Sequence, residues 1–436
     1  MELKPGYKQT ELGVIPEDWQ VAQIGELKPF ITSGSRGWAS YYSDRGSLFV
    51  RITNLLRDTI YLDLKNSKFV NLPPDASEGT RTQLQEHDVL ISITADIGIV
   101  GYVDSRVPTP TYINQHIALV RFDPAKTSGK FVSYFLASEK PQKLFRASTD
   151  VGAKAGMSLL TVNKLQLAFP SHPEQRAIAG ALSDVDALIG GLDQLIAKKR
   201  DLKQAAMQQL LTGQKRLPGF HGEWEVKRLG EIADVKTGPF GSSLHESDYV
   251  RDGTPIITVE HLGEFGVTHF NLPLVSDSDR HRLRAYSLEI GDIVFSRVGS
   301  VDRNALISPG EEGWLFSGRL LRVRTDRKKA FAPFLSYQFH GEAFKGLVRN
   351  VAVGQTMACL NTQILKGIAV VLPSLPEQTA IAEVLSDMDA ELAALEQRRD
   401  KTRALKQGMM QELLTGKTRL VDSGKLRVES GERRTS

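Results

Sequence analysis

The stretch PEQRAIAGALSDVDALI at residues 173–189 returns almost unchanged as PEQTAIAEVLSDMDAEL at residues 376–392. The match extends over residues 170–217 and 373–420 without a gap, and more than half of the aligned positions are identical. Self-similarity at a constant offset indicates an internal duplication, and two copies are too few for a solenoid of stacked repeats. The chain is therefore predicted to be a tandem duplication of one unit.

The duplication continues more weakly outside this stretch. WQVAQIGEL at residues 19–27 is matched by WEVKRLGEI at 224–232, and YFLASEKPQKLFR at 134–146 is matched by YQFHGEAFKGLVR at 337–349. Between these islands the two halves differ. Each unit is thus expected to consist of a variable globular domain followed by a nearly constant segment.

The constant segment is predicted to form one long helix in each copy. A serine followed three residues later by a glutamate has the spacing of a capping box, and a glycine stands where a left-handed cap would end the helix. About 40 residues at 1.5 Å per residue make a rod of roughly 60 Å. These residues are Ser171, Glu174 and Gly213 in the first copy and Ser374, Glu377 and Gly416 in the second.

Apolar residues three and four positions apart predict a coiled-coil seam along both helices. Polar residues interrupt this seam in mid-helix, at Lys199 in the first copy and at Arg398 and Thr402 in the second. The predicted seam consists of Ile178, Leu182, Val185, Ile189, Leu192, Ile196, Leu202, Ala206 and Leu210 in the first helix and of Ile381, Leu385, Met388, Leu392, Leu395, Leu405, Met409 and Leu413 in the second.

The order of the segments along the chain predicts how the helices pair. The first domain ends where the first helix begins, and the second domain begins shortly after that helix ends, so the domains are expected at opposite ends of a rod. The shared apolar stripe is best buried if the second helix runs back alongside the first. The predicted fold class is α/β, with two pseudo-symmetric α/β domains separated by two long helices that form an antiparallel coiled coil. The expected boundaries are 1–169, 170–217, 218–372 and 373–420, followed by a disordered tail at 421–436.

The composition is that of an ordinary globular protein. Of 436 residues, 41% are hydrophobic and 24% are charged, the net charge is +4 and the pI is about 8.9, which permits a nucleic-acid partner without arguing for one. The N-terminal residues have no apolar run of the kind a secretory signal needs, and no later run is long enough to span a bilayer. The single cysteine, Cys359, excludes an internal disulfide framework. We expect a cytoplasmic protein with no membrane partner.

Motifs for catalysis or metal binding are weak throughout. LLTGKT at residues 413–418 ends like a phosphate-binding loop, but Gln411 stands where that loop requires glycine, so a helix C-terminus is the favoured interpretation. The nine histidines lack metal-ligand spacing, and the acid-x-lysine pairs at 63–65 and 225–227 are interpreted as surface charge. The chain is expected to be non-catalytic and to bind no cofactor and no metal.

Several loops of the variable domains have compositions suited to DNA. Arginine can bond the edge of guanine with two hydrogen bonds, aromatic and hydroxyl side chains contact bases and sugars, and Gly/Ser-rich loops let backbone amides approach phosphates. The DNA-binding candidates are Arg36, Trp38, Tyr41, Tyr42, Arg45 and Arg51 in the first domain and Lys236, Gly238, Phe240, Gly241, Ser242, Ser243, Arg297, Ser300, Arg303 and Arg319 in the second.

Together these features resemble the specificity subunits of type I restriction-modification enzymes, over nearly the whole chain. The matching motifs are YKQTELGVIPEDW at residues 7–19, the twin helices that each close on LLTG, and TGPFGSSL with GDIVFSRVGS in the second domain. The resemblance implies two target recognition domains, each of which reads one half of a split sequence in double-stranded DNA. Because the two domains differ, we expect the target to be asymmetric.

The resemblance also implies partner subunits. Two adenine methyltransferase subunits would dock on the helices and use S-adenosylmethionine, and restriction subunits that use ATP and Mg²⁺ would bind through them. The docking faces expected from the sequence contain Asp184, Asp186, Lys198, Arg200 and Gln204 together with Asp387, Asp389, Lys401, Arg403 and Gln407. Two alternatives stay open: a self-contained DNA methyltransferase or nuclease, and a coiled-coil adaptor that does not touch DNA.

Overall fold

The computed structural model describes residues 5–34, 36–73, 77–149, 156–239, 244–263, 266–352, 358–420 and 426–427. The chain divides into two compact units. Unit 1 comprises Met1–Asp193 and Gln397–Ser436, and unit 2 comprises Gln194–Glu396. Each unit therefore contains one variable domain and a part of each long helix.

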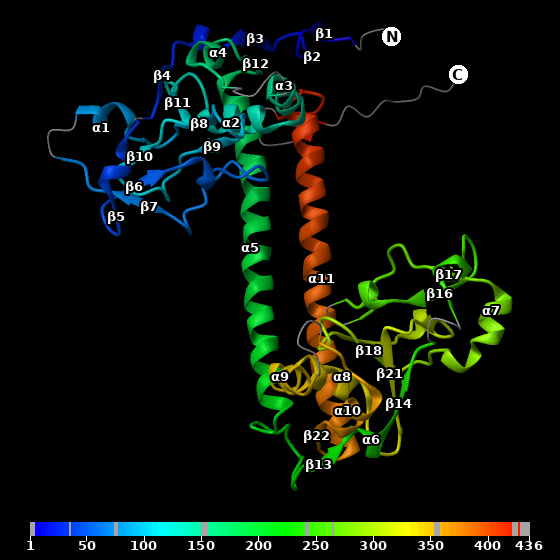
Figure 1. Cartoon of the computed structure of the whole chain (residues 1–436). Coiled ribbons are helices and arrows are strands. Elements are labelled where there is room, and N and C mark those ends of the chain that lie inside the picture. The colour runs from blue at the N-terminus through cyan, green and yellow to red at the C-terminus, as the bar shows by residue number, and fades with distance from the viewer. Residues whose placement is uncertain are drawn as a thin grey trace, which may run out of the picture. The chain divides into compact units, whose positions relative to one another are not determined.

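The two long helices are present as predicted. α5 spans His172–Leu210 and α11 spans Leu375–Leu413, each as one uninterrupted α-helix (Figure 1). Gly213 and Gly416 follow their ends with φ of 71° and 69°. These are left-handed values that glycine adopts without strain, so the predicted helix ends are confirmed, and LLTGKT is the end of a helix.

The helices run antiparallel within each unit. In unit 1, Asp186 and Asp193 of α5 bind Lys406 and Arg403 near the end of α11. In unit 2 the contacts are exchanged: Lys203 and Arg200 near the end of α5 bind residues 389 and 396 of α11. In both units the residue numbers rise along one helix as they fall along the other, which confirms the predicted direction of the pairing.

Each variable domain is built on a four-stranded antiparallel sheet. The strands of this sheet have the same order in the two domains. In unit 1 the order is β4 (Phe30–Ser33), β11 (Ile117–Arg121), β8 (Val89–Ser92) and β9 (Val100–Tyr102). In unit 2 it is β14 (Ala233–Thr237), β21 (Leu320–Thr325), β18 (Ile293–Ser296) and β19 (Asn304–Leu306). These strands consist largely of buried β-branched and aliphatic residues, as expected for a sheet covered on both faces.

A second four-stranded sheet accompanies the first in each unit. It has the order β10 (Thr111–Ile113), β6 (Ser47–Val50), β7 (Lys68–Val70) and β5 (Tyr42–Ser43) in unit 1. In unit 2 the order is β15 (Tyr249–Val250), β17 (Leu274–Val275), β16 (Thr254–Ile257) and β20 (Leu315–Phe316). One pair in each of these sheets is parallel, β10 with β6 and β16 with β20. The two units thus share their topology as well as their helices.

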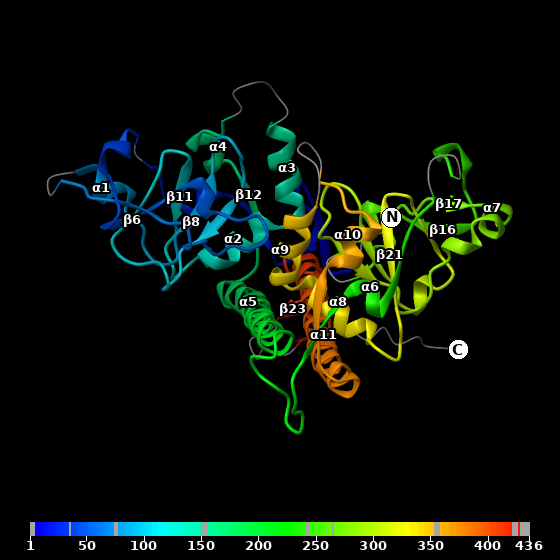
Figure 2. The same ribbon diagram turned by 60° about the horizontal axis from the view of Figure 1, so that its bottom comes forward.

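Short elements complete the units. β3 (Gln20–Gln23) pairs with β12 (Gln166–Phe169), β13 (Glu225–Arg228) with β22 (Ala369–Leu372), β1 (Tyr7–Thr10) with β2 (Gly13–Pro16), and β23 (Arg419–Leu420) with β24 (Leu426–Arg427). The helices are α1 (Ser77–Thr82), α2 (Gly129–Ala137), α3 (Glu139–Thr149), α4 (Leu159–Asn163), α6 (Leu229–Ile232), α7 (Asp277–Arg282), α8 (Ala332–His340), α9 (Glu342–Val351) and α10 (Thr362–Gly367). Figure 2 shows α2 beside β8, which it contacts. Of the tail at 421–436, the structure describes only residues 426–427.

The hydrophobic core of each domain includes the nearest part of both long helices. In unit 1, Ile178 and Leu182 of α5 share a buried cluster with Met410 and Leu413 of α11 and with the sheet. In unit 2 the corresponding residues of the duplication, among them Leu210, share a cluster with Ile381 and Leu385. Many predicted seam residues therefore belong to the domain cores. Within the described residues, Ile178, Leu182, Leu192, Ile381, Leu385 and Leu392 are buried, and Val185, Ile189, Met388 and Leu395 are half-buried.

Two leucines assigned to the seam lie on the surface instead. Leu202 is 49% exposed and Leu405 is 59% exposed. The neighbouring lysines, Lys203 and Lys406, occupy the inward positions and are each 5% exposed. The prediction was wrong at these positions because an aspartate on the opposite helix accepts each lysine, and the apolar periodicity of one helix carries no information about that partner.

None of the described helices is both long enough and apolar enough to cross a membrane.

Candidate nucleic-acid interface

Strand register gathers several DNA-binding candidates of unit 2 at one end of its first sheet. Thr237 at the end of β14 lies opposite Leu321, and Ser296 at the end of β18 lies opposite Leu320. The loops that follow β14 and β18 and the loop that precedes β21 therefore meet at the same end. We call residues 238–239, 297–303 and 317–319 the strand-end surface of unit 2. It contains the candidates Gly238, Arg297, Ser300, Arg303 and Arg319.

Unit 1 has a corresponding surface, formed by residues 34, 36, 93–96 and 114–116. The backbone frames match bond for bond. In unit 1, Ile93 N donates to His116 O at 2.9 Å, and Gly34 N donates to Ile117 O at 3.2 Å. In unit 2, the amides of residues 297 and 238 donate to the carbonyls of residues 319 and 320 at 2.9 and 3.1 Å. One further hydrogen bond is also matched. The amide of residue 157 donates to the carbonyl of residue 93 in unit 1, and the amide of residue 360 donates to the carbonyl of residue 297 in unit 2.

A glycine is required at the same point of both frames. A Cβ on Gly34 would lie 2.2 Å from the carbonyl oxygens of Ile113 and Asn114, and a Cβ on Gly238 would lie 2.1 Å from that of Ser317. Gly238, a predicted DNA contact, is buried, so the structure gives it a different role. It permits the close approach of two strands whose ends carry the exposed loops.

The side chains on the unit 2 frame are rich in arginine. Arg319 and Ser300 are exposed, and Arg297 is half-buried, with its Nη1 3.5 Å from the carbonyl oxygen of Gly318. Arg303 is exposed and donates to the carbonyl oxygen of Leu262. Guanidinium groups at the surface of a strand end are suited to guanine edges or phosphates.

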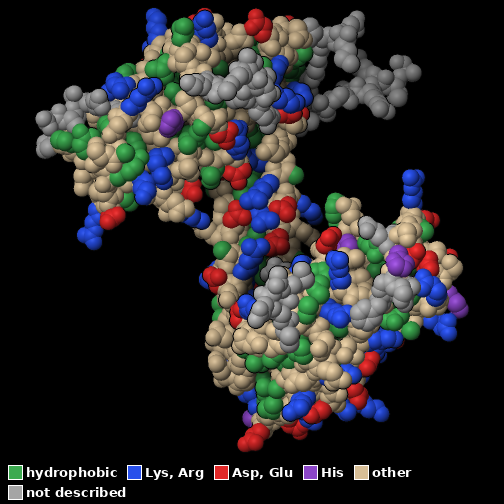
Figure 3. Space-filling model, in the orientation of Figure 1, with side chains coloured by type: hydrophobic (Ala, Val, Ile, Leu, Met, Phe, Trp, Pro, Cys, Tyr) green, Lys and Arg blue, Asp and Glu red, His purple; other side chains and the backbone are tan. Residues whose placement is uncertain are grey.

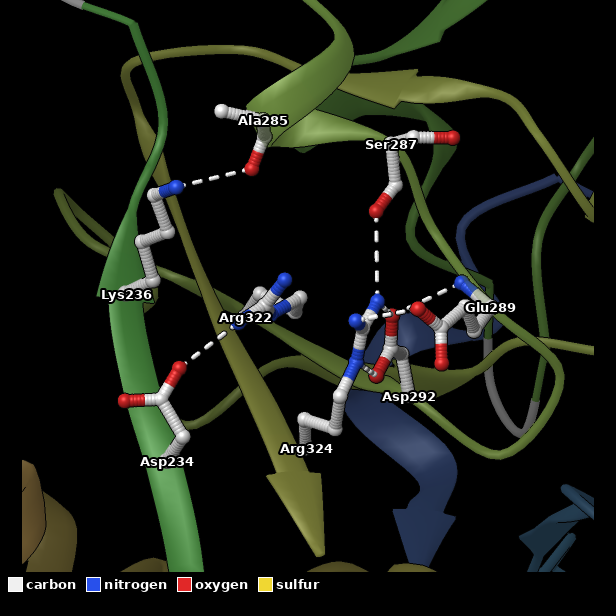
Figure 4. Close-up of polar contacts among 8 residues, drawn as sticks. All are labelled: Asp234, Lys236, Ala285, Ser287, Glu289, Asp292, Arg322 and Arg324. Atoms are coloured by element: carbon white, nitrogen blue, oxygen red, sulfur yellow. Dashed lines mark hydrogen bonds and ion pairs between the residues drawn. The ribbon is translucent and has the colours of Figure 1, made fainter.

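Ion pairs and a hydrogen bond hold the neighbouring basic residues of unit 2 in place (Figure 4). Lys236 donates from Nζ to the carbonyl oxygen of Ala285 at 2.8 Å, and this ammonium lies 4.7 Å from the centre of the Tyr286 ring. Arg322 donates to Asp234 at 2.7 Å, so its charge is balanced within the sheet. Lys236, a predicted DNA contact, is therefore half-buried and engaged within the protein.

Arg324 is held still more firmly on the same strand. Its Nε and Nη2 donate to the two oxygens of Asp292, each at 2.7 Å, and it also binds Glu289 and the carbonyl oxygen of Ser287. The hydrogen bond to Asp292 raises the pKa of Arg324. In unit 1 the equivalent Arg121 binds Asp88 in the same two-pronged way. This pair belongs to the shared frame and not to the variable surface.

The aromatic candidates of unit 1 separate into core and surface. Trp38 is only 4% exposed, stacks on Phe49 at 5.5 Å between ring centres and contacts Tyr112 edge-on at 5.4 Å. Trp38 therefore packs in the core beneath the exposed part of its loop, and the expectation that it contacts DNA is corrected to a core role. Tyr41 and Tyr42 are exposed.

The arginine candidates of unit 1 also differ in their exposure. Arg36 and Arg45 are exposed, whereas Arg51 is half-buried and donates to the carbonyl oxygen of Asn66 at 3.3 Å. The four candidates Phe240, Gly241, Ser242 and Ser243 lie outside the described residues.

The structure adds polar residues of unit 1 that the sequence analysis missed. Asn114, Gln115 and His116 lie on the strand-end surface, where Thr94 Oγ1 contacts His116 Nδ1 and Gln115 Nε2 lies 3.1 Å from His116 Nε2. Asn and Gln side chains suit adenine edges. Aligning the two halves at the offset of 203 residues would have found them, since they match residues 317–319, of which Arg319 was a candidate.

The described part of the chain contains no group of three His, Cys, Asp or Glu side chains placed to hold a metal ion. His261 Nδ1 contacts Thr258, His269 Nε2 lies 2.6 Å from Glu311, and the His269 ring lies tilted against Trp314 with 5.0 Å between ring centres. The acid-x-lysine pair Glu225 and Lys227 forms an ion pair of 2.7 Å on the surface.

The helix faces expected to dock partners need correction at two positions. Asp186 and Asp389 face inward, where each binds a lysine of the opposite helix. Arg200 and Arg403 form ion pairs between the two helices and remain exposed. The expected residues that are exposed and have no ion pair in the described structure are Asp184, Lys198, Gln204, Asp387, Lys401 and Gln407.

The same stripe of exposed side chains is repeated on each long helix. Its residues are spaced three and four positions apart, so they lie on one side of each helix, and all are exposed. Of the eight positions, six are identical in the two copies and two exchange glycine for alanine. Figure 3 shows basic and acidic side chains alternating over the long helices. This shared helix face consists of Asp184, Ala187, Gly191, Gln194, Lys198, Leu202, Ala205 and Gln208 in α5 and of Asp387, Ala390, Ala394, Gln397, Lys401, Leu405, Gly408 and Gln411 in α11.

Comparison with known proteins gives consistent matches. The family described as Type I restriction modification DNA specificity domain matches residues 16–198 and again 221–403. The type I restriction enzyme MjaVIII specificity subunit of Methanocaldococcus jannaschii is 22% identical over 425 residues, which cover 93% of this chain and 94% of that protein.

Two solved structures share the fold. The S subunit of the type I restriction-modification system from M. genitalium has a TM-score of 0.60 at 16% identity, covering 95% of this chain and 98% of that one. A chain from work on complex assembly and conformational transition of the type I R-M system has a TM-score of 0.53 at 16% identity, covering 92% and 99%.

Proposed function

The chain belongs to the family of type I restriction-modification DNA specificity subunits, and from this premise we propose that its two units read the two halves of one split DNA target. One observation carries the proposal. The strand-end frames of the two units have the same backbone hydrogen bonds, yet different side chains stand on them. A constant frame with variable side chains is what two reading surfaces need if they approach DNA in the same way but select different bases.

The proposed half-sites differ because the chemistry of the two surfaces differs. Unit 2 presents arginines, whose preferred base partner is guanine. Unit 1 presents the partly exposed side chains of Gln115 and His116, and the amide of Gln115 suits adenine. Asn114 is buried and accepts from the backbone amide of His116 at 3.2 Å, so it holds this loop in place. The proposed target is therefore asymmetric double-stranded DNA.

The catalytic steps belong to partner subunits in this proposal. Two adenine methyltransferase subunits would supply the chemistry of S-adenosylmethionine, and restriction subunits bound through them would use ATP and Mg²⁺. The shared helix face supports docking of like partners, because a surface stripe repeated on two helices offers the same contacts twice. Its glycines and alanines would let a partner backbone approach closely. The cytoplasmic location expected from the sequence is part of the proposal.

The reading assignment is tested with the chain assembled with methyltransferase subunits. Methylated adenines in random-sequence DNA are mapped for the native chain and for Arg319→Ala. We expect the native complex to methylate one split target, and the variant to accept more bases in one half of it only. Relaxation of both halves together, or methylation by the chain without any partner subunit, would contradict this assignment.

The helix pair is proposed to set the gap between the two half-sites. Inserting four residues, about one turn, into both helices adds about 6 Å. At about 3.4 Å per base pair, the gap should lengthen by roughly two base pairs while the half-sites stay the same. An unchanged gap in the mapped sites would count against this role.

Docking is tested on the shared helix face by co-purification. The variant combines Lys198→Glu and Leu202→Glu with Lys401→Glu and Leu405→Glu, and we expect it to lose the methyltransferase subunits. The comparison variant carries Gln204→Glu and Gln407→Glu. The sequence also assigned these exposed, repeated positions to docking, but they lie outside the shared helix face, about 200° around each helix from Leu202 and Leu405, and we expect this variant to keep the partner. Equal retention of the partner by both variants would contradict this location of the docking face.

A further inference from the structure

A lysine, an aspartate and a tyrosine form one network in each unit, and the lysine is buried in both. In unit 1, Lys406 of α11 lies 2.6 Å from Asp186 of α5, and the hydroxyl of Tyr134 in α2 donates to the other oxygen of Asp186 at 2.6 Å. Burial and the nearby carboxylate raise the pKa of Tyr134, so the phenol keeps its proton and remains a donor. One side chain each from two long helices and a domain helix thus meet at one carboxylate.

Unit 2 contains the same network with the two helices exchanged. Lys203 of α5 binds Asp389 of α11, and the hydroxyl of Tyr337 in α8 donates to Asp389 at 2.7 Å. Burial and Asp389 raise the pKa of Tyr337. The offset of 203 residues converts every member of one network into the corresponding member of the other.

Stability alone does not account for these lysines. Each lysine is 5% exposed, and removing a charge from water costs about as much as a buried ion pair returns, so hydrophobic residues at such sites are often as stable or more stable. The inward lysine also stands next to an outward leucine, at Leu202 and Leu405, in both copies. A helix selected only for burial would place the leucine inward.

The networks favour one alignment of α5 along α11 over alignments that are shifted by a helical turn. A slip of one helical turn moves the partner side chain by about 5.4 Å, which is too far for an ion pair. The slipped pairing would leave a buried lysine without its carboxylate at each site, and in unit 1 it would also leave the buried side chain of Asp186 unpaired. Polar residues in helix seams select register in this way. The tyrosine extends the selection to the domain, because it ties α2 or α8 to the same carboxylate.

We propose that Lys203 and Lys406 are positioning residues that hold the register of α5 against α11, and thereby fix the number of base pairs between the two half-sites. This inference rests on the proposed function for its effect on DNA, whereas its effect on the helices stands independently. The more exposed pairs between the helices, among them Arg200 with Glu396 and Arg403 with Asp193, contribute little to it, since charges in water pair weakly.

The test removes both charges of each pair so that no charge is left buried alone. The neutral variant carries Lys203→Met, Lys406→Met, Asp186→Asn and Asp389→Asn, and the asparagines can still accept from the tyrosines. In complex with methyltransferase subunits, we expect the native chain to methylate targets with one gap length. The neutral variant should methylate targets of two or more gap lengths with the same half-sites. A single unchanged gap would overturn the proposal.

Rescue and a matched control separate register from general damage. The swapped variant exchanges the charges within each pair, as Lys203→Asp with Asp389→Lys and Lys406→Asp with Asp186→Lys, and should restore a single gap length. If the neutral variant does not fold, the swapped variant decides: one gap length supports the proposal, and several overturn it.

The control removes two exposed pairs, Arg200 with Glu396 and Arg403 with Asp193, through Arg200→Ala and Arg403→Ala. It should keep one gap length, and mixed gap lengths in the control would overturn the special role of the lysines.

A measurement without DNA keeps this inference distinct from the proposed function. Spin labels are placed at Ala187→Cys in α5 and Gln407→Cys in α11, two exposed positions of unit 1, in a chain with Cys359→Ser. We expect one distance in the native background and a broad or multiple distribution in the neutral variant. An unchanged single distance there would overturn the proposal. If the native complex methylates no split target, the proposed function fails, and the label distances still decide the register.

Discussion

Unit 1 and unit 2 are alike where they meet the long helices and different where their strands end. The networks of Tyr134 and Tyr337 correspond atom for atom, and so do the backbone frames. On those frames, however, Ile93 in unit 1 replaces Arg297, and His116 replaces Arg319. Under the proposed function, geometry and base choice would therefore be carried by different residues, and one could change without the other.

The comparison also reveals an asymmetry within the shared parts. The side chain of Asp186 in unit 1 is 8% exposed, whereas that of Asp389 in unit 2 is 34% exposed. Just beyond the helix ends, Arg419 binds two carboxylates, Glu174 and Asp18. Among the described residues Arg216 binds one carboxylate, Glu377, and the carbonyl oxygens of His221 and Gly222. Sequence spacing assigned Glu174 and Glu377 to capping boxes, and these arginine contacts came only from the fold. The same plan is thus realised with different energetics in the two units.

The largest expected effect is a difference in stability between the variants that lack one of the two buried lysines. Lys406→Met leaves Asp186 buried and charged without its ion-pair partner, which should cost about 3 kcal/mol of unfolding free energy, because lone buried charges are strongly destabilising. Lys203→Met leaves the more hydrated Asp389 and should cost roughly 1 kcal/mol. Urea unfolding of both variants measures the difference. Equal losses would mean that exposure of the aspartate does not control the cost.

The next effect concerns base discrimination by the strand-end surfaces of the two units. Arg319→Ala should weaken discrimination in the unit 2 half-site, and His116→Ala should do so in the unit 1 half-site, each by about 1–3 kcal/mol if the side chain makes a good base contact. Binding is measured with duplexes that carry base changes in one half-site at a time. Loss of affinity that is uniform across all sequences would show that the residue contacts phosphate instead.

A smaller effect should distinguish the units by pH. Burial lowers the pKa of His340 in α8, where Nδ1 donates to the carbonyl oxygen of Ser336 at 2.7 Å, and unit 1 has Ala137 at the equivalent position. A histidine with a depressed folded pKa contributes stability that is present above its unfolded pKa of about 6.5 and is lost as the pH falls.

Thermal unfolding between pH 8 and pH 5 checks this expectation. The native chain should lose stability below about pH 6.5 that His340→Gln does not lose. His221→Gln, at an exposed histidine, is the matched control and should follow the native chain. Parallel curves for all three proteins would contradict the assignment.

The smallest expected effect concerns the additional carboxylate of unit 1. The hydrogen bond from Arg419 lowers the pKa of Asp18, so its contribution is present above the unfolded value of about 3.9 and is lost as the pH falls through the lower folded pKa. Asp18 is mostly exposed, and the contribution should be at most about 0.5 kcal/mol. Asp18→Asn should flatten the acid limb of the stability curve below about pH 4. Glu223→Gln, at the corresponding position of unit 2, should leave it unchanged.

Features that local chemistry specifies were predictable from the sequence. The duplication, the long helices and their glycine ends were read directly, since repeat identity, apolar spacing and the left-handed preference of glycine need no distant partner. Most seam residues followed for the same reason. Exposed loop candidates such as Arg319 were also found, because polar Gly-rich loops lie at the surface of most domains.

Only the tertiary structure decided which residues face inward at a particular contact. Lys203 and Lys406 took the inward positions in place of the neighbouring leucines because aspartates on the opposite helix, far away in the chain, hold their charges. Trp38 moved from surface to core because Phe49 and Tyr112 enclose it, and strand register brought residues 114–116 beside residue 94. In each case the deciding free energy comes from a partner distant in sequence, and periodicity within one segment does not contain it.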